Sequence, residues 1–466
     1  RKDPKGRGEC TMAEIEKYSY KIVKKIRIRI PDVPGALGIV ATELGKKGAV
    51  LGDITKVHLT SQYITRDVIL FFDDEQQFLE TIAHLEQLKG YKILSIEDEV
   101  MHIHLGGKIA ITPTVKVDTL SDLRMIYTPG VAQVCTYIAE HPDAAREYTS
   151  IGNCVCIATN GSAILGLGNI GVLAGMPVME GKSVILHKMA GVSCIPLLIE
   201  SDDADRIVDT LEAVSKTFSV IMIEDIRAPL CFEVEEKLQE RIPIPVFHDD
   251  QHGTATVILA ALIKAIQLVD KKKETVKIII NGAGAAGMAT AKMLLEYGFR
   301  HITICDRNGA IYSNRPGHMD PYKHAIAEIT NATEESGPLR EIMRGKDVFI
   351  GVSAANLVSQ DMVRSMNSAP IIFALANPIP EIHLEDALNA GAAVALDGRT
   401  INNSLVFPGL IRGTLDAGAS RINFPMKFSA AETLASLAGK HDIVPNFMNL
   451  GVHKKIADAV KQAATG

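Results

Sequence analysis

The sequence predicts an α/β protein built on doubly wound parallel sheets, with a smaller antiparallel domain before them. Three observations support this fold class. Residues 22–96 alternate between strand and helix patterns, two later apolar runs end in paired carboxylates, and a third apolar run leads through a glycine-rich turn into a helix. Short buried strands separated by helices are typical of α/β proteins.

The bulk composition limits the functional classes. With 466 residues, 47% hydrophobic and 22% charged, the chain is long enough for two or three domains. A formal charge of −6 gives no reason to expect a nucleic acid or an anionic membrane as a partner. The seven cysteines, an odd number in apolar surroundings, favour reduced thiols, and no apolar run reaches transmembrane length. We therefore expect a cytoplasmic protein, with residues 1–17 as a disordered leader.

The first domain, residues 18–96, follows the order βαββαβ, which is a ferredoxin-like plan. The strand patterns cover 22–30, 50–59, 64–72 and 91–96, the helical patterns cover 36–47 and about 74–88, and residues 97–107 read as a linker. The turn Asp32-Val-Pro-Gly-Ala-Leu37 resembles that of the ACT domain, a regulatory module that often binds amino acids. This resemblance implies a small-molecule effector site at Asp32, Pro34, Gly35 and Leu37. Pure dimerisation is the alternative.

Paired carboxylates follow two apolar runs in the middle of the chain. Glu224 and Asp225 end the first run, and Asp249 and Asp250 end the second. Because ligands of open parallel sheets collect at the carboxyl ends of strands, we expect four acids at one crevice. Such acids repel one another unless a cation or protons intervene, and oxygen ligands suit Mg²⁺ or Mn²⁺. The alternative is that they are helix-capping and solvated loop residues.

Two further residues carry candidate acid–base chemistry. Tyr127 precedes Thr-Pro-Gly130, and Lys182 follows glycine at the start of an apolar segment. A tyrosine can donate a proton, and burial of a lysine lowers its pKa toward the working range of a base. Taken alone, each residue fits a structural reading better: a packing tyrosine and a surface lysine.

The run Asn281-Gly-Ala-Gly-Ala-Ala-Gly287 follows an apolar strand and opens a helix. Gly282, Gly284 and Gly287 match the G-x-G-x-x-G fingerprint of a Rossmann domain, with Ala285 and Ala286 between them. Asp306 ends the next predicted strand, where a carboxylate would bind a ribose hydroxyl and favour NAD. The neighbouring Arg307 leaves NADP open as the cofactor.

Several long motifs together resemble the malic enzymes, specifically the compact bacterial form, from about Lys108 to the C-terminus. They are Tyr127-Thr-Pro-Gly130, Gly161-Ser-Ala-Ile-Leu-Gly-Leu-Gly-Asn169, Pro177-Val-Met-Glu-Gly-Lys182, Glu224-Asp225 and Phe247-His-Asp-Asp-Gln-His-Gly-Thr254. The resemblance implies a substrate and metal domain at 108–270, an NAD-binding domain at 271–420, and C-terminal helices at 421–466 that pack back on the substrate domain.

The resemblance also implies roles for individual residues. Tyr127 is expected to be the general acid, Lys182 the general base with Asp249 beside it, and Glu224, Asp225 and Asp250 the ligands of Mn²⁺ or Mg²⁺. Asn377 and one of Asn402 or Asn403 are expected to contact substrate, with Asn377 also near the cofactor; without the resemblance they read as turn formers. Larger malic enzymes carry an arginine where this chain has Ala163, so the partner of the substrate carboxylate at that point is open.

The expected reaction is the oxidative decarboxylation of L-malate to pyruvate and CO₂ with reduction of NAD, in a homodimer or higher homo-oligomer. Two alternatives come from other classes. One is another NAD-linked dehydrogenase acting on amino or hydroxy acids, for which divalent metal would be dispensable. The other is a nucleotide- and amino-acid-sensing protein without turnover, against which the presence of Tyr127, Lys182 and the three acids argues.

Overall fold

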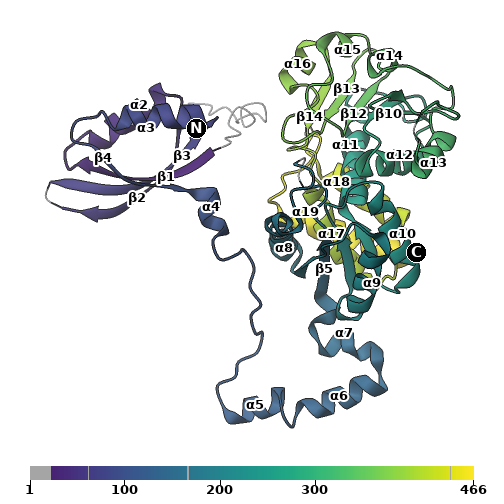
Figure 1. Cartoon of the computed structure of the whole chain (residues 1–466), viewed down its shortest axis with the longest axis horizontal. Helices are drawn as coiled ribbons and strands as arrows, with labels where there is room; N and C mark the ends of the chain where they lie inside the picture. The colour runs from purple at the N-terminus through teal and green to yellow at the C-terminus, as the bar shows by residue number, and fades with distance from the viewer. Residues whose placement is uncertain (1–21, 61, 165–166, 318, 441, 466) are drawn as a thin grey trace, which may run out of the picture. The chain divides into compact units, whose positions relative to one another are not determined.

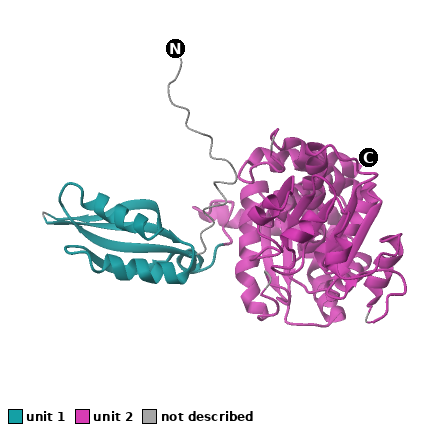
Figure 2. Cartoon of the chain, turned by 90° about the horizontal axis from the view of Figure 1, so that it is seen from above, with its two compact units in different colours: residues 1–108 teal, residues 109–466 magenta. Residues whose placement is uncertain are grey.

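The computed structural model describes residues 22–60, 62–164, 167–317, 319–440 and 442–465. The chain forms two compact units, residues 1–108 and residues 109–466 (Figure 2). The predicted leader at 1–17 lies outside the described residues. No described helix is long and apolar enough to cross a membrane.

The first unit is an antiparallel sheet covered on one face by two helices. Its elements are β1 (Ile22–Pro31), α2 (Ala36–Lys46), β2 (Val50–Leu59), β3 (Tyr63–Phe72), α3 (Glu75–Leu85) and β4 (Lys92–Asp98). The sheet order is β2-β3-β1-β4, with Ile26 of β1 opposite Val68 of β3. Alternate residues Ile26, Ile28 and Ile30 are buried, as a half-buried strand requires. The predicted ferredoxin-like order is therefore confirmed.

The expected linker at 97–107 is only partly an irregular segment. β4 continues to Asp98, and a short helix, α4 (Glu99–His104), follows it. The side chain of Asp98 accepts a hydrogen bond from the Met101 amide and so caps this helix. The sequence prediction missed the helix because six residues are too few to show helical periodicity.

The second unit contains a four-stranded parallel sheet, made of β5 (Cys154–Thr159), β6 (Ser193–Leu198), β7 (Val220–Ile223) and β8 (Val246–His248). The order is β6-β5-β7-β8, so the chain leaves β5 on one side and later continues on the other. In open α/β sheets, ligands bind at such a reversal, beyond the carboxyl ends of the strands, which here are those of β5 and β7. The helices that alternate with these strands are α8 (Met176–Ala190), α9 (Ala204–Val214), α10 (Leu230–Arg241) and α11 (Thr254–Leu268).

The same unit contains a six-stranded sheet of Rossmann order, β11-β10-β9-β12-β13-β14. All neighbouring strands are parallel except β10 and β11. The strands are β9 (Lys277–Asn281), β10 (His301–Asp306), β11 (Gly309–Ala310), β12 (Val348–Gly351), β13 (Ile371–Ala374) and β14 (Val394–Asp397). The associated helices are α12 (Ala285–Tyr297), α13 (Pro321–Ile329), α14 (Leu339–Ile342), α15 (Gln360–Arg364) and α16 (Leu384–Asn389). Both sheets confirm the predicted α/β class (Figure 1).

Three C-terminal helices complete the second unit: α17 (Phe407–Ala417), α18 (Phe424–Leu437) and α19 (Leu450–Thr465). α19 packs against α17, α18 and α8, and α18 also packs against α11. α17 and α19 can approach closely because α17 has glycine at the contact. A β-carbon on Gly413 would lie 2.5 Å from the Ala457 carbonyl oxygen.

A helical segment connects residue 109 to β5 and buries little of its own surface. Its main helices are α5 (Leu120–Ile126), α6 (Val131–Glu140) and α7 (Ala145–Tyr148), and none of them contains a buried residue. Leu120 and Met125 are each 63% exposed. Isolated helices this short are marginal in water.

Candidate active site

The two acidic pairs lie side by side because their strands are neighbours. Ile223, the last residue of β7, is in register with His248, the last residue of β8. Glu224 and Asp225 leave the first strand. Asp249 and Asp250 begin η5 (Asp249–Gly253), a π-helical turn that leads into α11.

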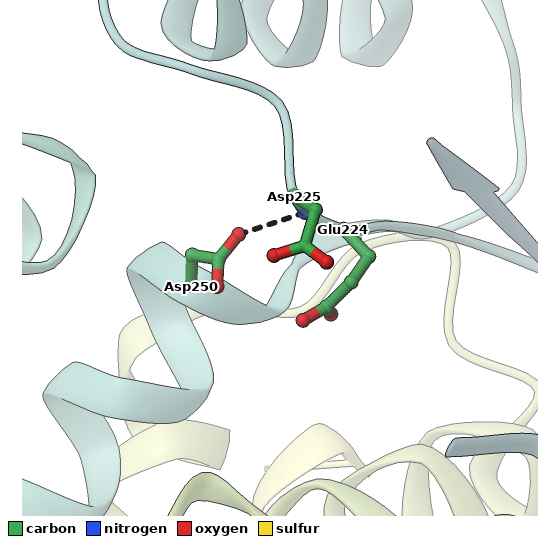
Figure 3. Close-up of side chains that lie close together, drawn as sticks. All are labelled: Glu224, Asp225 and Asp250. Atoms are coloured by element: carbon green, nitrogen blue, oxygen red, sulfur yellow. Dashed lines mark hydrogen bonds between the residues drawn. The ribbon is translucent and has the colours of Figure 1, made fainter. Parts of the chain in front are cut away.

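Glu224, Asp225 and Asp250 form a compact cluster of oxygen atoms. One carboxylate oxygen from each lies within 4.8 Å of the other two (Figure 3). The Asp225 amide also donates a hydrogen bond of 3.0 Å to Asp250 Oδ2. Asp225 has a φ of 52°, a left-handed conformation that costs free energy for a residue with a side chain. The fold keeps this conformation where it turns the Asp225 carboxylate toward its neighbours.

The electrostatics of the cluster favour a bound cation. Burial raises the pKa of Glu224, and the nearby Asp250, Asp249 and Asp225 raise it further against the opposing effect of Lys182. Glu224 Oε2 is buried and has no hydrogen-bond partner among the described residues. A buried carboxylate oxygen without a donor costs free energy unless a cation or proton satisfies it. The all-oxygen cluster therefore fits a hard divalent ion such as Mg²⁺ or Mn²⁺.

Lys182 lies in the second turn of α8 and points into this acidic cluster. Its Nζ is 2.8 Å from Glu224 Oε1 and also donates a hydrogen bond to Asp249 Oδ2. The ring of Phe407 covers the ammonium group at 5.0 Å from its centroid. Asp249 itself is completely buried.

The net pKa shift of Lys182 is opposite to the expected one when only the protein groups act on it. Burial lowers the pKa of Lys182 as expected, but the attraction of Asp249 and then Glu224 outweighs burial and raises it. The sequence could not show this balance, because the two acids are 42 and 67 residues away along the chain.

Tyr127 is placed differently from Lys182. It follows the last residue of α5 and is 67% exposed. Among the described residues, no hydrogen bond or ring contact joins its side chain to the acidic cluster. The single chain therefore brings together Lys182, Asp249 and the three metal-ligand candidates, but leaves Tyr127 outside.

The glycine-rich turn has the shape that a dinucleotide requires. A β-carbon on Gly287 would lie 1.8 Å from the Gly282 carbonyl oxygen, so helix α12 can approach the turn only with glycine there. Around Gly284 there is open space, which leaves room for a phosphate to approach the backbone. Ala285 and Ala286 form the first turn of α12, where free amides attract anions.

Asp306 ends β10. Its carboxylate binds two cationic side chains that were not predicted from the sequence. Arg315 donates hydrogen bonds of 2.8 and 2.7 Å to its two oxygens, and Lys323 donates one of 3.0 Å. Burial would raise the pKa of Asp306, but the hydrogen bonds from Arg315, the Asn308 amide and Lys323 hold it well below its usual value. Arg307, which the sequence suggested as a neighbour of the cofactor, is exposed. No short motif marks Arg315 or Lys323, because they lie 9 and 17 residues after Asp306.

The three asparagines occupy different settings. Asn377 follows β13 and is exposed. Its side-chain amide packs closely on Gly398, where a β-carbon would lie only 2.9 Å from the amide nitrogen. The side chain of Asn402 accepts a hydrogen bond from the Ser404 amide, which is a local turn. Asn403 packs on Gly253, at the end of the acidic turn. Of the pair, Asn403 is therefore the residue beside the candidate site.

Ala163 contributes its backbone to the same region. Its amide donates a hydrogen bond of 3.0 Å to the Asp225 carbonyl oxygen. This bond ties the loop after β5 to the metal-ligand candidates, although the methyl side chain offers no charge to a substrate.

In the first unit, the predicted effector loop forms the turn into α2. Gly35 has a φ of 85° and precedes the helix, and no atom lies within 4 Å of the position of a β-carbon. Asp32 and Pro34 are exposed, whereas Leu37 packs against the core of the unit. The Asp32 amide donates a hydrogen bond to the Gln62 carbonyl oxygen.

Comparison with known proteins identifies the family. Residues 106–239 match the family described as "Malic enzyme, N-terminal domain", and residues 251–401 match "Malic enzyme, NAD binding domain". The chain belongs to the malic enzyme family. It is 41% identical to the NAD-dependent malic enzyme of Geobacillus stearothermophilus over 435 residues, which is 91% of each chain. It is also 45% identical to an NADP-dependent malic enzyme of Haemophilus influenzae over 342 residues, or 72% of this chain and 45% of that one.

A solved malic enzyme has the same fold. The crystal structure of the NAD-dependent malic enzyme from Thermotoga maritima superposes with a TM-score of 0.76 at 39% identity. The superposition covers 78% of this chain and 99% of the Thermotoga chain. The resemblance seen in the sequence motifs is therefore confirmed.

Proposed function

We propose that this malic enzyme oxidises L-malate and decarboxylates it to pyruvate and CO₂, with NAD or NADP as the acceptor and Mn²⁺ or Mg²⁺ as a required ion. The observation that carries the proposal is the position of Lys182, which contacts Glu224 of the cation-binding cluster and Asp249 beside it. A base next to a divalent cation is what oxidation of a 2-hydroxy acid needs.

Each residue of the cluster has a distinct part. Glu224, Asp225 and Asp250 would hold the ion, which supplies positive charge to polarise the hydroxyl and the developing carbonyl of the substrate. Lys182 takes the hydroxyl proton from malate at its Nζ. That step requires a neutral amine, and the charge of an ion on Glu224 offsets the attraction that raises the pKa of Lys182 in the metal-free chain. Asp249 holds the amine in place.

Tyr127 is proposed as the acid that protonates the carbon left after CO₂ departs, and it reaches the site from a second copy of the chain. The residues around it support this arrangement. α5 and α6 bury none of their residues in the single chain, and Leu120, Met125 and Tyr127 are each more than 60% exposed. A hollow of about 640 Å³ also runs along α6, lined by Val134, Tyr137 and Tyr148 among others. Exposed apolar side chains in this number favour a protein interface, and in a twofold homodimer the same residues of both copies would be covered.

Both dinucleotides are proposed as cofactors. A lone Asp306 would repel the 2′-phosphate of NADP, but here Arg315 and Lys323 neutralise it and leave one positive charge in excess. Asn377 and Asn403 are proposed to orient the substrate and the nicotinamide amide through neutral hydrogen bonds.

The first unit is proposed to be an ACT-like module. The open space at Gly35 would admit a small effector at the turn of Asp32, Pro34 and Leu37, and dimerisation through this unit is the alternative. Titration of the full chain with amino acids by isothermal titration calorimetry separates the two roles, because only an effector site releases or absorbs binding heat. A cytoplasmic location stays a prediction.

The test of the catalytic proposal is reduction of the nicotinamide by the purified chain with L-malate, with Mn²⁺ and after removal of metal by chelation. We expect turnover and stoichiometric pyruvate only with metal present. Metal-independent oxidation without pyruvate would instead identify another kind of dehydrogenase, and absence of turnover in every condition would favour a sensor.

A further inference from the structure

A second cavity of the larger unit is lined by side chains other than those of the metal-ligand candidates. It has a volume of about 310 Å³ and is bounded by α10, α12 and α18, with β8 and η5 behind it. Its polar lining includes Glu235, Glu236, Gln239, His252, Lys292 and Lys427. Lys182, Glu224, Asp225 and Asp250 do not line it. A volume of this size is at the lower end of small-molecule sites.

The buried acid of the cavity is already satisfied by hydrogen bonds from the protein. Glu235 is 6% exposed and accepts hydrogen bonds from the His248 amide, from Gln251 Nε2 and from His252 Nε2. Glu236 is exposed and accepts a hydrogen bond from the Tyr322 hydroxyl. The buried carboxylate of the cavity, Glu235, therefore already has its donors within the protein.

The basic groups have fewer hydrogen-bond partners. Lys427 is 5% exposed, and its Nζ makes one hydrogen bond within the described residues, of 3.3 Å to His252 Nδ1. Because a lysine ammonium only donates, this Nδ1 accepts and the Nε2–H of His252 donates to Glu235. An ammonium carries three donors, so two N–H groups of Lys427 have no acceptor in the part of the chain that the structure describes.

A second lysine lines the same cavity from another helix. Lys292 of α12 is exposed and has no hydrogen bond or ion pair to a described residue. Two lysines on α12 and α18 thus face a space whose buried acid, Glu235, is already hydrogen-bonded by the protein. Buried polar groups without partners are rare in folded proteins and point to a missing ligand.

We propose that this cavity binds a small oxyanion, a carboxylate or a phosphate, through Lys427 and Lys292. The anion accepts the unused N–H donors of Lys427 inside the cavity and meets Lys292 at its mouth. The Phe424 ring, 4.6 Å from the Lys427 ammonium, closes the apolar side of the site. Charge-assisted hydrogen bonds in a partly buried site are the strongest kind that a lysine makes.

The test is isothermal titration calorimetry of the full chain without added divalent metal, at constant ionic strength, with inorganic phosphate in one arm and succinate in the other. The variants are Lys427→Met and Lys292→Met. Lys455→Met, at an exposed position of α19, is the matched control. We expect Lys455→Met to bind as the wild type does, and both cavity variants to weaken binding about tenfold or more in the arm that matches the natural ligand.

Each outcome decides the proposal. Loss confined to phosphate identifies a phosphorylated ligand, and loss confined to succinate identifies a carboxylate. Because succinate also fits a malate site, only the affinity lost in the cavity variants counts. Binding unchanged in both variants, or absent in the wild type for both anions, overturns the proposal. Lys292 is exposed, so its variant carries the test even if Lys427→Met fails to fold, and none of these outcomes depends on malate turnover.

Discussion

At the scale of the residue, Lys182 shows what the sequence alone could and could not establish. The paired acids after two apolar runs predicted a cation cluster, because strand ends and carboxylates are both local signals. The ion pairs of Lys182 with Glu224 and Asp249 are long-range, and they reverse the pKa shift expected from burial alone. The cations around Asp306 were missed for the same reason.

Lys182 is expected to be indispensable for malate oxidation. Replacement by methionine keeps the length of the side chain but removes the amine, so kcat should fall by about 10²- to 10⁴-fold. Lys188→Met, on an exposed position of the same helix, should leave kcat unchanged. Steady-state assays with saturating malate and Mn²⁺ measure both variants. Near-normal turnover of Lys182→Met would remove Lys182 from the mechanism.

Lys323 is expected to support NADP more than NAD. Its Nζ lies 3.0 Å from Asp306 Oδ2, and Lys323→Gln removes the excess positive charge beside the expected ribose site. We expect kcat/KM for NADP to fall about tenfold further than kcat/KM for NAD. Lys216→Gln, in the short helical turn before β7, is the control. Equal losses for both dinucleotides would show that Lys323 only supports the fold.

Lys427 should make stability depend on pH in the alkaline range. Burial lowers its pKa to about 8 against the opposing effect of Glu235, whereas the unfolded value is 10.5. Between these values the unfolded chain binds the extra proton, so the free energy of unfolding should rise with pH, by up to about 3 kcal/mol. Chemical denaturation of the wild type and of Lys427→Met from pH 7.5 to 10.5 isolates this contribution. A constant difference between the two proteins across that range would contradict it.

At the scale of the element, the strands were the most predictable part of the chain. Apolar runs that end in carboxylates or a glycine-rich turn predicted β7, β8, β9 and β10, and the structure places a strand on each. β6 was not recognised as a strand. Short helices were less visible. α4 and α5 were not recognised, because their length gives fewer than two turns of periodicity and α5 has no buried face.

The contact between α17 and α19 is expected to depend on Gly413. Alanine there would place its β-carbon 2.5 Å from the Ala457 carbonyl oxygen and 2.7 Å from Val460 Cβ, so one helix must move. We expect Gly413→Ala to destabilise the larger unit by about 1–3 kcal/mol. Gly45→Ala in α2, where no atom lies within 4 Å, should instead leave the larger unit unchanged. Thermal unfolding measured by calorimetry compares the two variants, and equal melting of the larger unit in both would show that the contact relaxes freely.

At the scale of the whole molecule, the single chain brings Lys182, Asp249 and the three metal-ligand candidates together but leaves Tyr127 outside this cluster. The motif around Tyr127 is as clear in the sequence as that around Lys182, yet no sequence pattern tells which copy of a chain a side chain serves. The exposed apolar residues of α5 and α6 are the observation on which we base the proposal that Tyr127 serves a second copy.

A shared site makes a prediction that separates it from a site within one chain. Tyr127→Phe and Lys182→Met should each be nearly inactive alone. If Tyr127 serves the partner, a hybrid dimer of the two variants carries both substitutions in one site and neither in the other. Random exchange of subunits makes half of the dimers hybrid, so activity should recover to about a quarter of the wild-type value. The control is Lys182→Met taken through the same exchange procedure alone, which should stay inactive. Size-exclusion chromatography verifies that the subunits exchange. Exchange without recovery would place Tyr127 and Lys182 in the same chain's site, and would require α5 to fold back toward α8.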